Sequence, residues 1–479
     1  MADVLAVRGR ATESISPGAL VIALGGLALV AIFADILLGT GAWFFGIAGV
    51  LLLAGVLTRP ELGIAVFLST FLITYPQALQ GTGFLTINNV LGLLFVVLMA
   101  HRVYITGDWW FLRNPELRIL ALIVACYYVS AFVNGPEPRL LQLIGVPEEA
   151  PDSTRLFVNR VAFVVFFINF IERPAHIKLI FLLAIGMIVL TTLIALWGFS
   201  HGTALHGYRA QTFDVSGTVQ SAANPNRLAL LAIIAVAALW YASQQIRSWA
   251  VRGVLFAFIL VEVLAVLLSA SRSGLVALLA GAAFIAFDEG VSIRKVVAIA
   301  LAASMTVLLA LWFVPEKNLE RLENLPGTES AAEGVGAGSL ARRSYTLELG
   351  EQIIRDNFFF GVGVGNWEIT RYMNDPTHST AAPHSSVLLA WVEGGVFCVL
   401  AFATLFWRAW QNLVVAQQRL PHRGEGDFRW IVKAARVAVF TLAAFSLVAD
   451  LWSNIVLFWL VGLTVVCRRY AEQRVAPAV

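Results

Sequence analysis

Charged side chains are scarce in this sequence. Asp, Glu, Lys and Arg make up 13% of its 479 residues, whereas about a quarter of the residues in a soluble domain are charged. Hydrophobic residues reach 59%, and the mean hydropathy is +0.80. This composition excludes an ordinary soluble protein and predicts an integral membrane protein.

Cysteine is also scarce. The only three cysteines, Cys126, Cys398 and Cys467, all fall inside apolar stretches. This number and placement exclude a disulfide framework and a cysteine-based metal site, because both need clustered or regularly spaced thiols. We therefore expect the three side chains to pack in the interior.

Apolar windows recur along the whole chain and leave no room for a separate soluble domain. Because a helix needs roughly 17 to 25 residues to cross a hydrocarbon core of about 30 Å, we predict an all-α polytopic protein, a single membrane domain over 1–479, with about 12 to 14 transmembrane helices. Arg8 and Arg10 precede the first window and no cleavage pattern follows it, so we expect that span to be retained. The predicted spans are 18–38, 41–57, 61–76, 86–104, 116–133, 155–172, 176–198, 226–246, 251–270, 273–289, 293–314, 384–410, 429–448 and 451–468.

The distribution of Lys and Arg predicts the orientation, because positively charged connections stay on the cytoplasmic side. With both termini inside, most of the 33 basic residues fall on the inner side. The remainder lie mainly in two long outer segments, 199–225 and 315–383, or at span ends. Short translocated connections usually lack arginine, so these outer arginines indicate that an anion is bound there.

Two outer arginines are of particular interest, one in a tight connection between spans and one in a polar loop. Arg272 lies in SASRSGLVALL, a tight connection rich in small residues. A guanidinium at this place is costly to bury unless it meets an anion, although it can also reach out to lipid phosphates. Arg209 lies in GYRAQTFDVSGTVQSAANPNRLALL, where either Asn224 or Asn226 is expected to cap the helix that begins near Pro225. Arg209 can equally be a solvated loop residue.

The segment 315–383 changes character along its length. PEKNLERLENLPGTESAAEGVGAGS is acidic and glycine-rich, so we expect it to be mobile. Apolar residues at helical spacing then predict an amphipathic helix over 340–357 on the outer surface, with Arg342 and Arg343 in its first turn. Gly361, Gly363 and Gly365 follow, and this pattern is more typical of a structural turn than of a phosphate site.

His384 and Glu393 lie in HSTAAPHSSVLLAWVEGGVF. Pro383 ends the preceding segment, so His384 is expected at a helix N-terminus on the same face as the arginines. The helix dipole and nearby guanidinium groups disfavour imidazolium, and a neutral ring can accept a proton. A helix-capping, interfacial role for His384 is the alternative. Glu393 is costly in lipid and is expected to orient another polar group.

These motifs, in this order, resemble the O-antigen ligase and polymerase superfamily of bacterial envelope enzymes. The resemblance extends over roughly 199–410 and rests on YRAQTF, NPNRLAL, SASRSGLVAL, RRSYTLELGEQIIRDNFFFGVGVGNWE and PHSSVLLAWVEGGVF. The sequence differs from the family at Ser385, where asparagine is usual, and at Phe358 to Phe360, where a proline usually precedes the glycines.

The resemblance implies a type C-like glycosyltransferase of the bacterial inner membrane whose active site faces the periplasm. Its donor would be a glycan on undecaprenyl diphosphate, and its acceptor lipid A-core or another glycan, with no cofactor, metal ion or nucleic acid. By motif position, Arg209, Arg272 and Arg343 would bind the diphosphate, with Arg342 able to exchange roles with Arg343. His384 would be the base, with Glu393 and Asn226 in supporting positions.

Three alternatives remain open from the sequence. A polymerase of the same superfamily would use a second lipid-linked glycan as acceptor. A transporter of lipid-linked glycans would also bind diphosphate, but it needs charge along a path through the membrane. A metal site would have to combine His201, His206, His378 and His384, whose spacing matches no usual ligand pattern.

Overall fold

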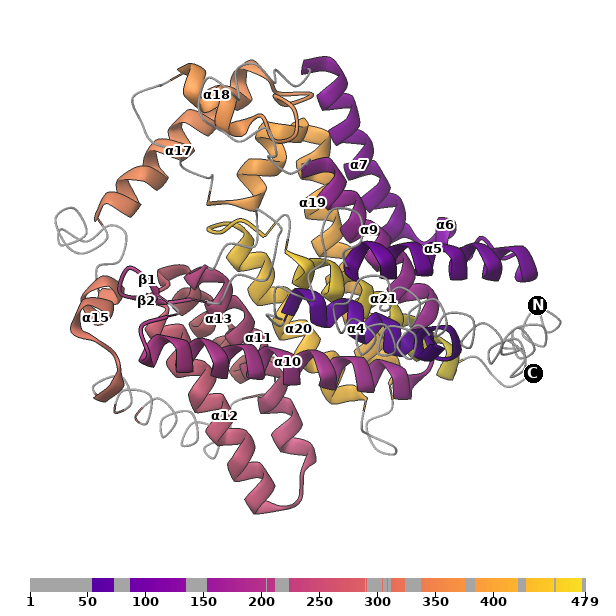
Figure 1. Cartoon of the computed structure of the whole chain (residues 1–479), viewed down its shortest axis with the longest axis horizontal. Coiled ribbons are helices and arrows are strands. Elements are labelled where there is room, and N and C mark those ends of the chain that lie inside the picture. The colour runs from indigo at the N-terminus through magenta and orange to yellow at the C-terminus, as the bar shows by residue number, and fades with distance from the viewer. Residues whose placement is uncertain are drawn as a thin grey trace, which may run out of the picture.

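The computed structural model describes residues 54–72, 87–134, 153–203, 205–211, 224–288, 290, 304, 308, 312–323, 337–374, 384–420, 428–451 and 454–475. This part of the chain is almost entirely helical, with one two-stranded hairpin (Figure 1). The helices of the first half are α4 (Pro60–Leu72), α5 (Ile87–Thr106), α6 (Trp110–Arg113), α7 (Pro115–Asn134), α9 (Ser153–Phe170) and α10 (Pro174–Ser200). The hairpin follows, made of β1 (Leu205–His206) and β2 (Arg209–Ala210). The remaining helices are α11 (Pro225–Gln245), α12 (Trp249–Leu268), α13 (Arg272–Asp288), α15 (Glu316–Glu323), α17 (Ala337–Asp356), α18 (Trp367–Asn374), α19 (Ser386–Arg419), α20 (Arg429–Ser446) and α21 (Ile455–Val475).

Within these ranges, six helices are long and apolar enough to cross a membrane, namely α5, α7, α10, α11, α12 and α19. Large apolar side chains such as Phe132 and Trp249 are exposed, as expected for surfaces that face lipid. The prediction of an all-α, multi-pass membrane protein is therefore confirmed. Three predicted spans, 18–38, 41–57 and 293–314, lie wholly or mostly outside the described residues, so the total number of spans stays a prediction.

Helix starts follow from local sequence. Proline occupies the first position of α10 and α11, where its missing N–H costs nothing. The side chains of Asn224, Ser248 and Ser385 accept backbone hydrogen bonds as N-caps of α11, α12 and α19. Of the two predicted caps, Asn224 is therefore the one that caps α11.

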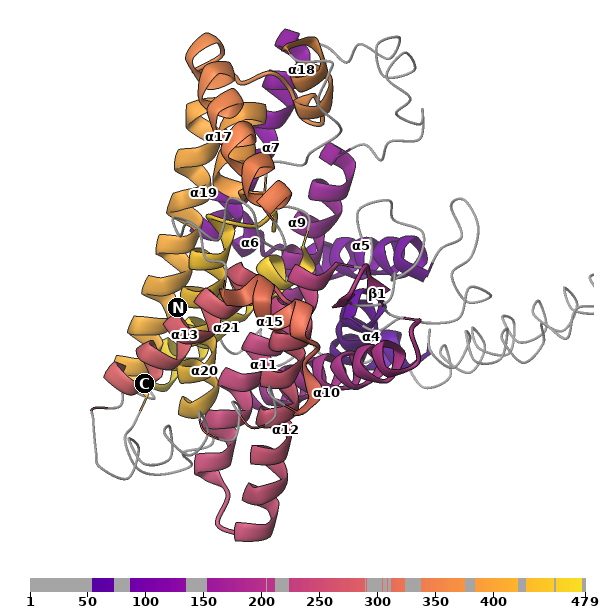
Figure 2. The same ribbon diagram turned by 90° about the vertical axis from the view of Figure 1, so that its left-hand side faces the viewer.

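The helical core is built around α19, which packs against α7, α20 and α21, and around α11, which packs against α12 and α20. Figure 2 shows α19, α20 and α21 running side by side. The three cysteines are free thiols, and Cys398 and Cys467 are buried in this core.

Helix α19 is not one continuous span. Gly395 has φ 76° and ψ −175°, which divides α19 into a short segment, 386–394, and a long one, 396–419. The short segment is about 14 Å long and cannot cross a core of about 30 Å, whereas the long one can. The predicted span 384–410 falls on α19, but the prediction did not include this break. The sequence EGG permits the break because glycine adopts positive φ without strain.

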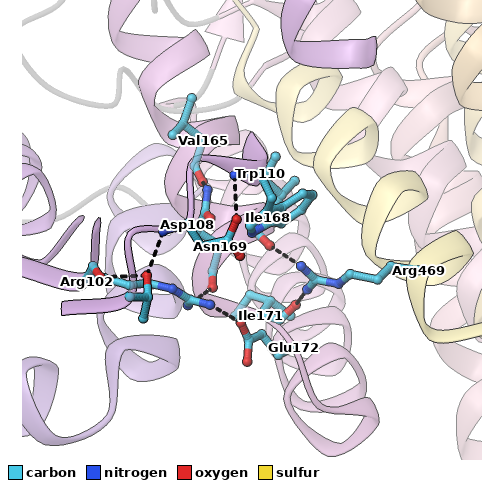
Figure 3. Close-up of polar contacts among 10 residues, drawn as sticks. Arg102, Asp108, Trp110, Val165, Ile168, Asn169, Ile171, Glu172 and Arg469 are labelled. Carbon is cyan, nitrogen blue, oxygen red and sulfur yellow. Dashed lines mark hydrogen bonds and ion pairs between the residues drawn. The ribbon is translucent and has the colours of Figure 1, made fainter. Parts of the chain in front are cut away.

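The carboxyl end of α9 is capped by two arginines from other helices (Figure 3). Arg102 of α5 donates to the carbonyl of Asn169 and pairs with Glu172. Arg469 of α21 donates to the carbonyl of Ile168 at 2.8 Å and to that of Ile171. Cations at a helix C-terminus satisfy unpaired carbonyls and the helix dipole. The two arginines therefore meet at one end of α9.

Candidate active site

The connection between α12 and α13 is tight and strained. Ala270 has φ 44°, and it is the one non-glycine residue with positive φ among those described. Such a conformation costs of order 1 to 3 kcal/mol and persists only when its surroundings hold it. The Ser271 hydroxyl provides part of that support, since it donates to Asn226 Oδ1 at 2.8 Å and accepts from the Gly274 amide at 3.1 Å. Arg272 follows at once and is largely buried.

The hairpin places Arg209 against this connection. Its Nε donates to the Ser269 carbonyl at 2.8 Å, and its Nη2 donates to Asn226 Oδ1 at 3.3 Å. Asn226, in the first turn of α11, therefore joins Arg209 to Ser271. Arg209 is therefore held by hydrogen bonds within the protein, which argues against the alternative in which it is a solvated loop residue.

Helix α15 contributes an arginine that sequence reasoning did not select. The prediction that 315–339 is mobile is wrong for 316–323, which is a helix packed against α12 and α13. Asn318 is fully buried and donates to the Leu268 carbonyl at 2.7 Å. Arg321 donates from Nε to the Ala270 carbonyl at 3.2 Å and from Nη1 to the Tyr208 hydroxyl at 3.3 Å.

Helix α17 brings Arg343 within electrostatic reach of Arg321. This helix begins three residues before the predicted 340–357 and packs against α19. Burial and the positive charge of Arg321 lower the pKa of Arg343, and its buried Nε has no hydrogen-bond partner in the described part of the chain. The side chain of Arg342 lies outside the described residues.

His384 lies just before the N-cap of α19 and is half-buried. Its pKa is lowered by burial first, and then by the positive charges of Arg343 and Arg209. Each of these effects disfavours imidazolium, so the ring is neutral at pH 7. The charges of Arg321, Arg343 and Arg272 act on Arg209, and those of Arg343 and Arg209 act on His384, so these residues lie within electrostatic reach of one another. We call them the arginine site: Arg209, Arg272, Arg321, Arg343 and His384. In Figure 1 the elements that carry the arginines, namely the hairpin, α13, α15 and α17, lie on one side of the molecule.

The glycine turn after α17 docks on the break in α19. Val362 and Gly363 donate backbone hydrogen bonds to the carbonyls of Val392 and Glu393 at 2.7 and 3.2 Å, and Glu393 Oε1 accepts from the Gly365 amide at 3.0 Å. A Cβ on Gly361 would lie 2.5 Å from the Val392 carbonyl oxygen. The turn therefore fixes the short segment of α19 that follows His384.

Three arginines of the arginine site have no carboxylate partner among the described residues, unlike the arginines of the other clusters. Elsewhere, Arg408 pairs with Glu116, Arg436 with Asp288 and Arg468 with Glu472. Arg209, Arg321 and Arg343 form no ion pair with any carboxylate of the described residues, although all three are at least partly buried. Burial and the charge of Arg321 lower the pKa of Arg209 to about 9. Such a cluster is stabilised by an anionic ligand.

The histidines proposed for a metal site are not gathered in the described structure. His201 is exposed, lies against Trp197 with 4.5 Å between ring centroids, and its Nδ1 contacts the Trp197 carbonyl. His378 and the side chain of His206 lie outside the described residues. The residues that the structure does describe contain no group of three His, Cys, Asp or Glu side chains placed to hold a metal ion.

Arg321 is the site residue that the sequence reasoning missed. The available signal was NLERLE, where Leu319 and Leu322 share a helix face, while Asn318 and Arg321 fall three positions apart. The surrounding acidic and glycine-rich composition concealed this short amphipathic helix. No motif of the resemblance included it.

Residues 256–403 match the model of a family described as O-antigen ligase. No curated protein matches the chain. The matched segment includes Arg272, Arg321, Arg343, His384 and Glu393, and it begins after Arg209 and Asn226. The resemblance is therefore confirmed for this segment: residues 256–403 of a multi-pass helical membrane protein are similar to O-antigen ligases.

Proposed function

From the O-antigen ligase domain we propose that this protein transfers a glycan from undecaprenyl diphosphate to an acceptor hydroxyl at the periplasmic face of the bacterial inner membrane. The favoured acceptor is lipid A-core, as in lipopolysaccharide synthesis. The observation that carries this proposal is the arginine site, where Arg209, Arg321 and Arg343 form no ion pair with a described carboxylate and a neutral histidine lies nearby. Both termini would be cytoplasmic, as the distribution of basic residues predicts.

The chemistry that we propose needs two kinds of group. The acceptor oxygen attacks the anomeric carbon of the donor glycan, and the bond from that carbon to the phosphate oxygen breaks. The bonding electrons stay on the lipid diphosphate, whose charge Arg209, Arg272 and Arg343 would stabilise, with Arg342 able to replace Arg343. The acceptor proton moves to His384, which is neutral at pH 7 and can take it. No step in this scheme uses a metal ion.

Glu393 and Asn226 would support the site without contacting substrate. Glu393 holds the glycine turn against α19, and Asn226 holds Arg209 and Ser271. Pre-organised groups of this kind matter because a site displaced by about 1 Å can lose roughly 10²-fold in rate.

The test is transfer by the purified protein in detergent, with an undecaprenyl-diphosphate-linked oligosaccharide and EDTA present. We expect lipid A-core to receive the glycan when it is added. Extension of the donor glycan instead would identify a polymerase. Absence of any transfer, together with movement of the same lipid across proteoliposomes, would contradict the proposal and indicate a transporter.

A further inference from the structure

Arg321 has a place in the arginine site that the resemblance does not assign. Its backbone carbonyl accepts a hydrogen bond from Arg272 Nε at 2.9 Å, while its own guanidinium donates to the Ala270 carbonyl and the Tyr208 hydroxyl. Arg321 therefore contacts both the strained connection and the side chain that follows it. Among the arginines, its charge is the one with the largest effect on Arg209 and Arg343.

The hydrogen bonds that Arg321 makes with described residues do not compensate its charge. Both acceptors, a carbonyl and a hydroxyl, are neutral, and Nη2 donates to none of the described residues. The helix that carries Arg321 is held rigidly, since the buried Asn318 ties α15 to the end of α12. A fixed guanidinium that has no carboxylate partner among the described residues is suited to bind an anion.

The reaction changes the charge of its donor. In a glycan-linked lipid diphosphate each phosphate has one ester bond and shares the bridging anhydride oxygen, so the diphosphate carries two negative charges. When the bond between glycan and phosphate breaks, the terminal phosphate gains an ionisable oxygen whose second pKa is about 6, so that it is mostly ionised at pH 7. The leaving group thus gains negative charge that the donor does not have.

We propose that Arg321 is a further anion-binding side chain of this site, and that it stabilises the negative charge that the lipid diphosphate gains as the glycan leaves. This inference rests on the proposed function. An interaction that is stronger with the leaving group than with the donor lowers the barrier, whereas one that is equal with both only tightens donor binding. Arg321 therefore acts on turnover more than on donor affinity.

The experiment compares Arg321→Gln, Arg321→Lys and wild type for kcat, donor KM and inhibition by added undecaprenyl diphosphate. Arg355→Gln is the matched control, because Arg355 lies on α17, is exposed and pairs with Glu351. We expect Arg321→Gln to lower kcat by about 10²-fold, to change donor KM by less than about threefold, and to weaken product inhibition. Arg321→Lys keeps the positive charge but loses the two hydrogen bonds. If the charge is what matters, the kcat of Arg321→Lys should be at least about tenfold higher than that of Arg321→Gln.

Two results would overturn the inference. In one, Arg321→Gln behaves as Arg355→Gln does. In the other, Arg321→Lys is as slow as Arg321→Gln, which assigns Arg321 to clamping Ala270 alone. If Arg321→Gln does not fold, Arg321→Met, which keeps the aliphatic stem, takes its place with the same expectations. Failure of the wild-type protein to transfer glycan would contradict the proposed function itself, whereas normal wild-type transfer with silent Arg321 variants contradicts only this inference.

Discussion

The carboxylate of Glu393 accepts a hydrogen bond from the backbone amide of Gly365 over 3.0 Å. This bond joins the glycine turn after α17 to the short segment of α19, two elements that are adjacent in space but 28 residues apart. Because Arg343 lies on α17 and His384 precedes α19, the same bond helps to set the position of the proposed base relative to the proposed anion site.

Replacement of Glu393 tests whether this connection matters. Glu393→Gln keeps an acceptor oxygen for the Gly365 amide, whereas Glu393→Ala leaves that amide without its partner, at a cost of about 1 to 3 kcal/mol. We expect the alanine variant to lose more thermal stability in detergent, and more transfer activity, than the glutamine variant. Equal losses in both variants would show that the hydrogen bond is not what Glu393 contributes.

Gly395→Ala tests the break in α19. A Cβ at this position would lie 2.0 Å from the Phe359 carbonyl oxygen, and the backbone has positive φ. We expect this variant to be strongly destabilised, measured as a fall in melting temperature or in the yield of monodisperse protein. Gly253→Ala is the control, since a Cβ there meets nothing within 4 Å and alanine favours helix α12. A Gly395→Ala protein as stable as the control would contradict the broken helix.

Arg343→Gln should change the pH dependence of transfer. The positive charge of Arg343 helps to keep the pKa of His384 below its ordinary value, so its removal raises that pKa. The acid limb of the kcat/KM profile should then move to higher pH, while Arg355→Gln on the same helix leaves it in place. An acid limb at the same pH in Arg343→Gln as in wild type would show that the charge of Arg343 does not influence the pKa of His384.

Arg272→Lys tests whether Arg272 binds an anion through its forked guanidinium. Lysine keeps the charge but loses the planar fork and the Nε bond to the Arg321 carbonyl. We expect transfer to fall by roughly 10-fold or more, with weaker donor binding, and Arg272→Ala to do no better. Full turnover in Arg272→Lys would mean that the residue only anchors the helix end to lipid phosphates.

The sequence predicts the helical membrane fold and the residues whose motifs carry chemistry, because both depend on composition and local order. Arg209, Arg343 and His384 lie far apart in the chain, yet the structure brings them within electrostatic reach of one another. The break at Gly395 was not predictable from the apolar window. Hydropathy depends on residue type alone, so it does not reveal where the backbone takes a positive φ. The position of Arg321 depends on tertiary contacts with Ala270 and Tyr208, which no local pattern encodes.

The central claim is that His384 takes the proton from the acceptor hydroxyl, and His384→Ala tests it most directly. The measurement is donor binding and glycan transfer by the purified variant, with His201→Ala, an exposed histidine outside the arginine site, as control. The account predicts that donor binding and expression stay close to wild type while transfer falls by roughly 10² to 10⁴-fold. Transfer by His384→Ala at a rate near that of His201→Ala would contradict it.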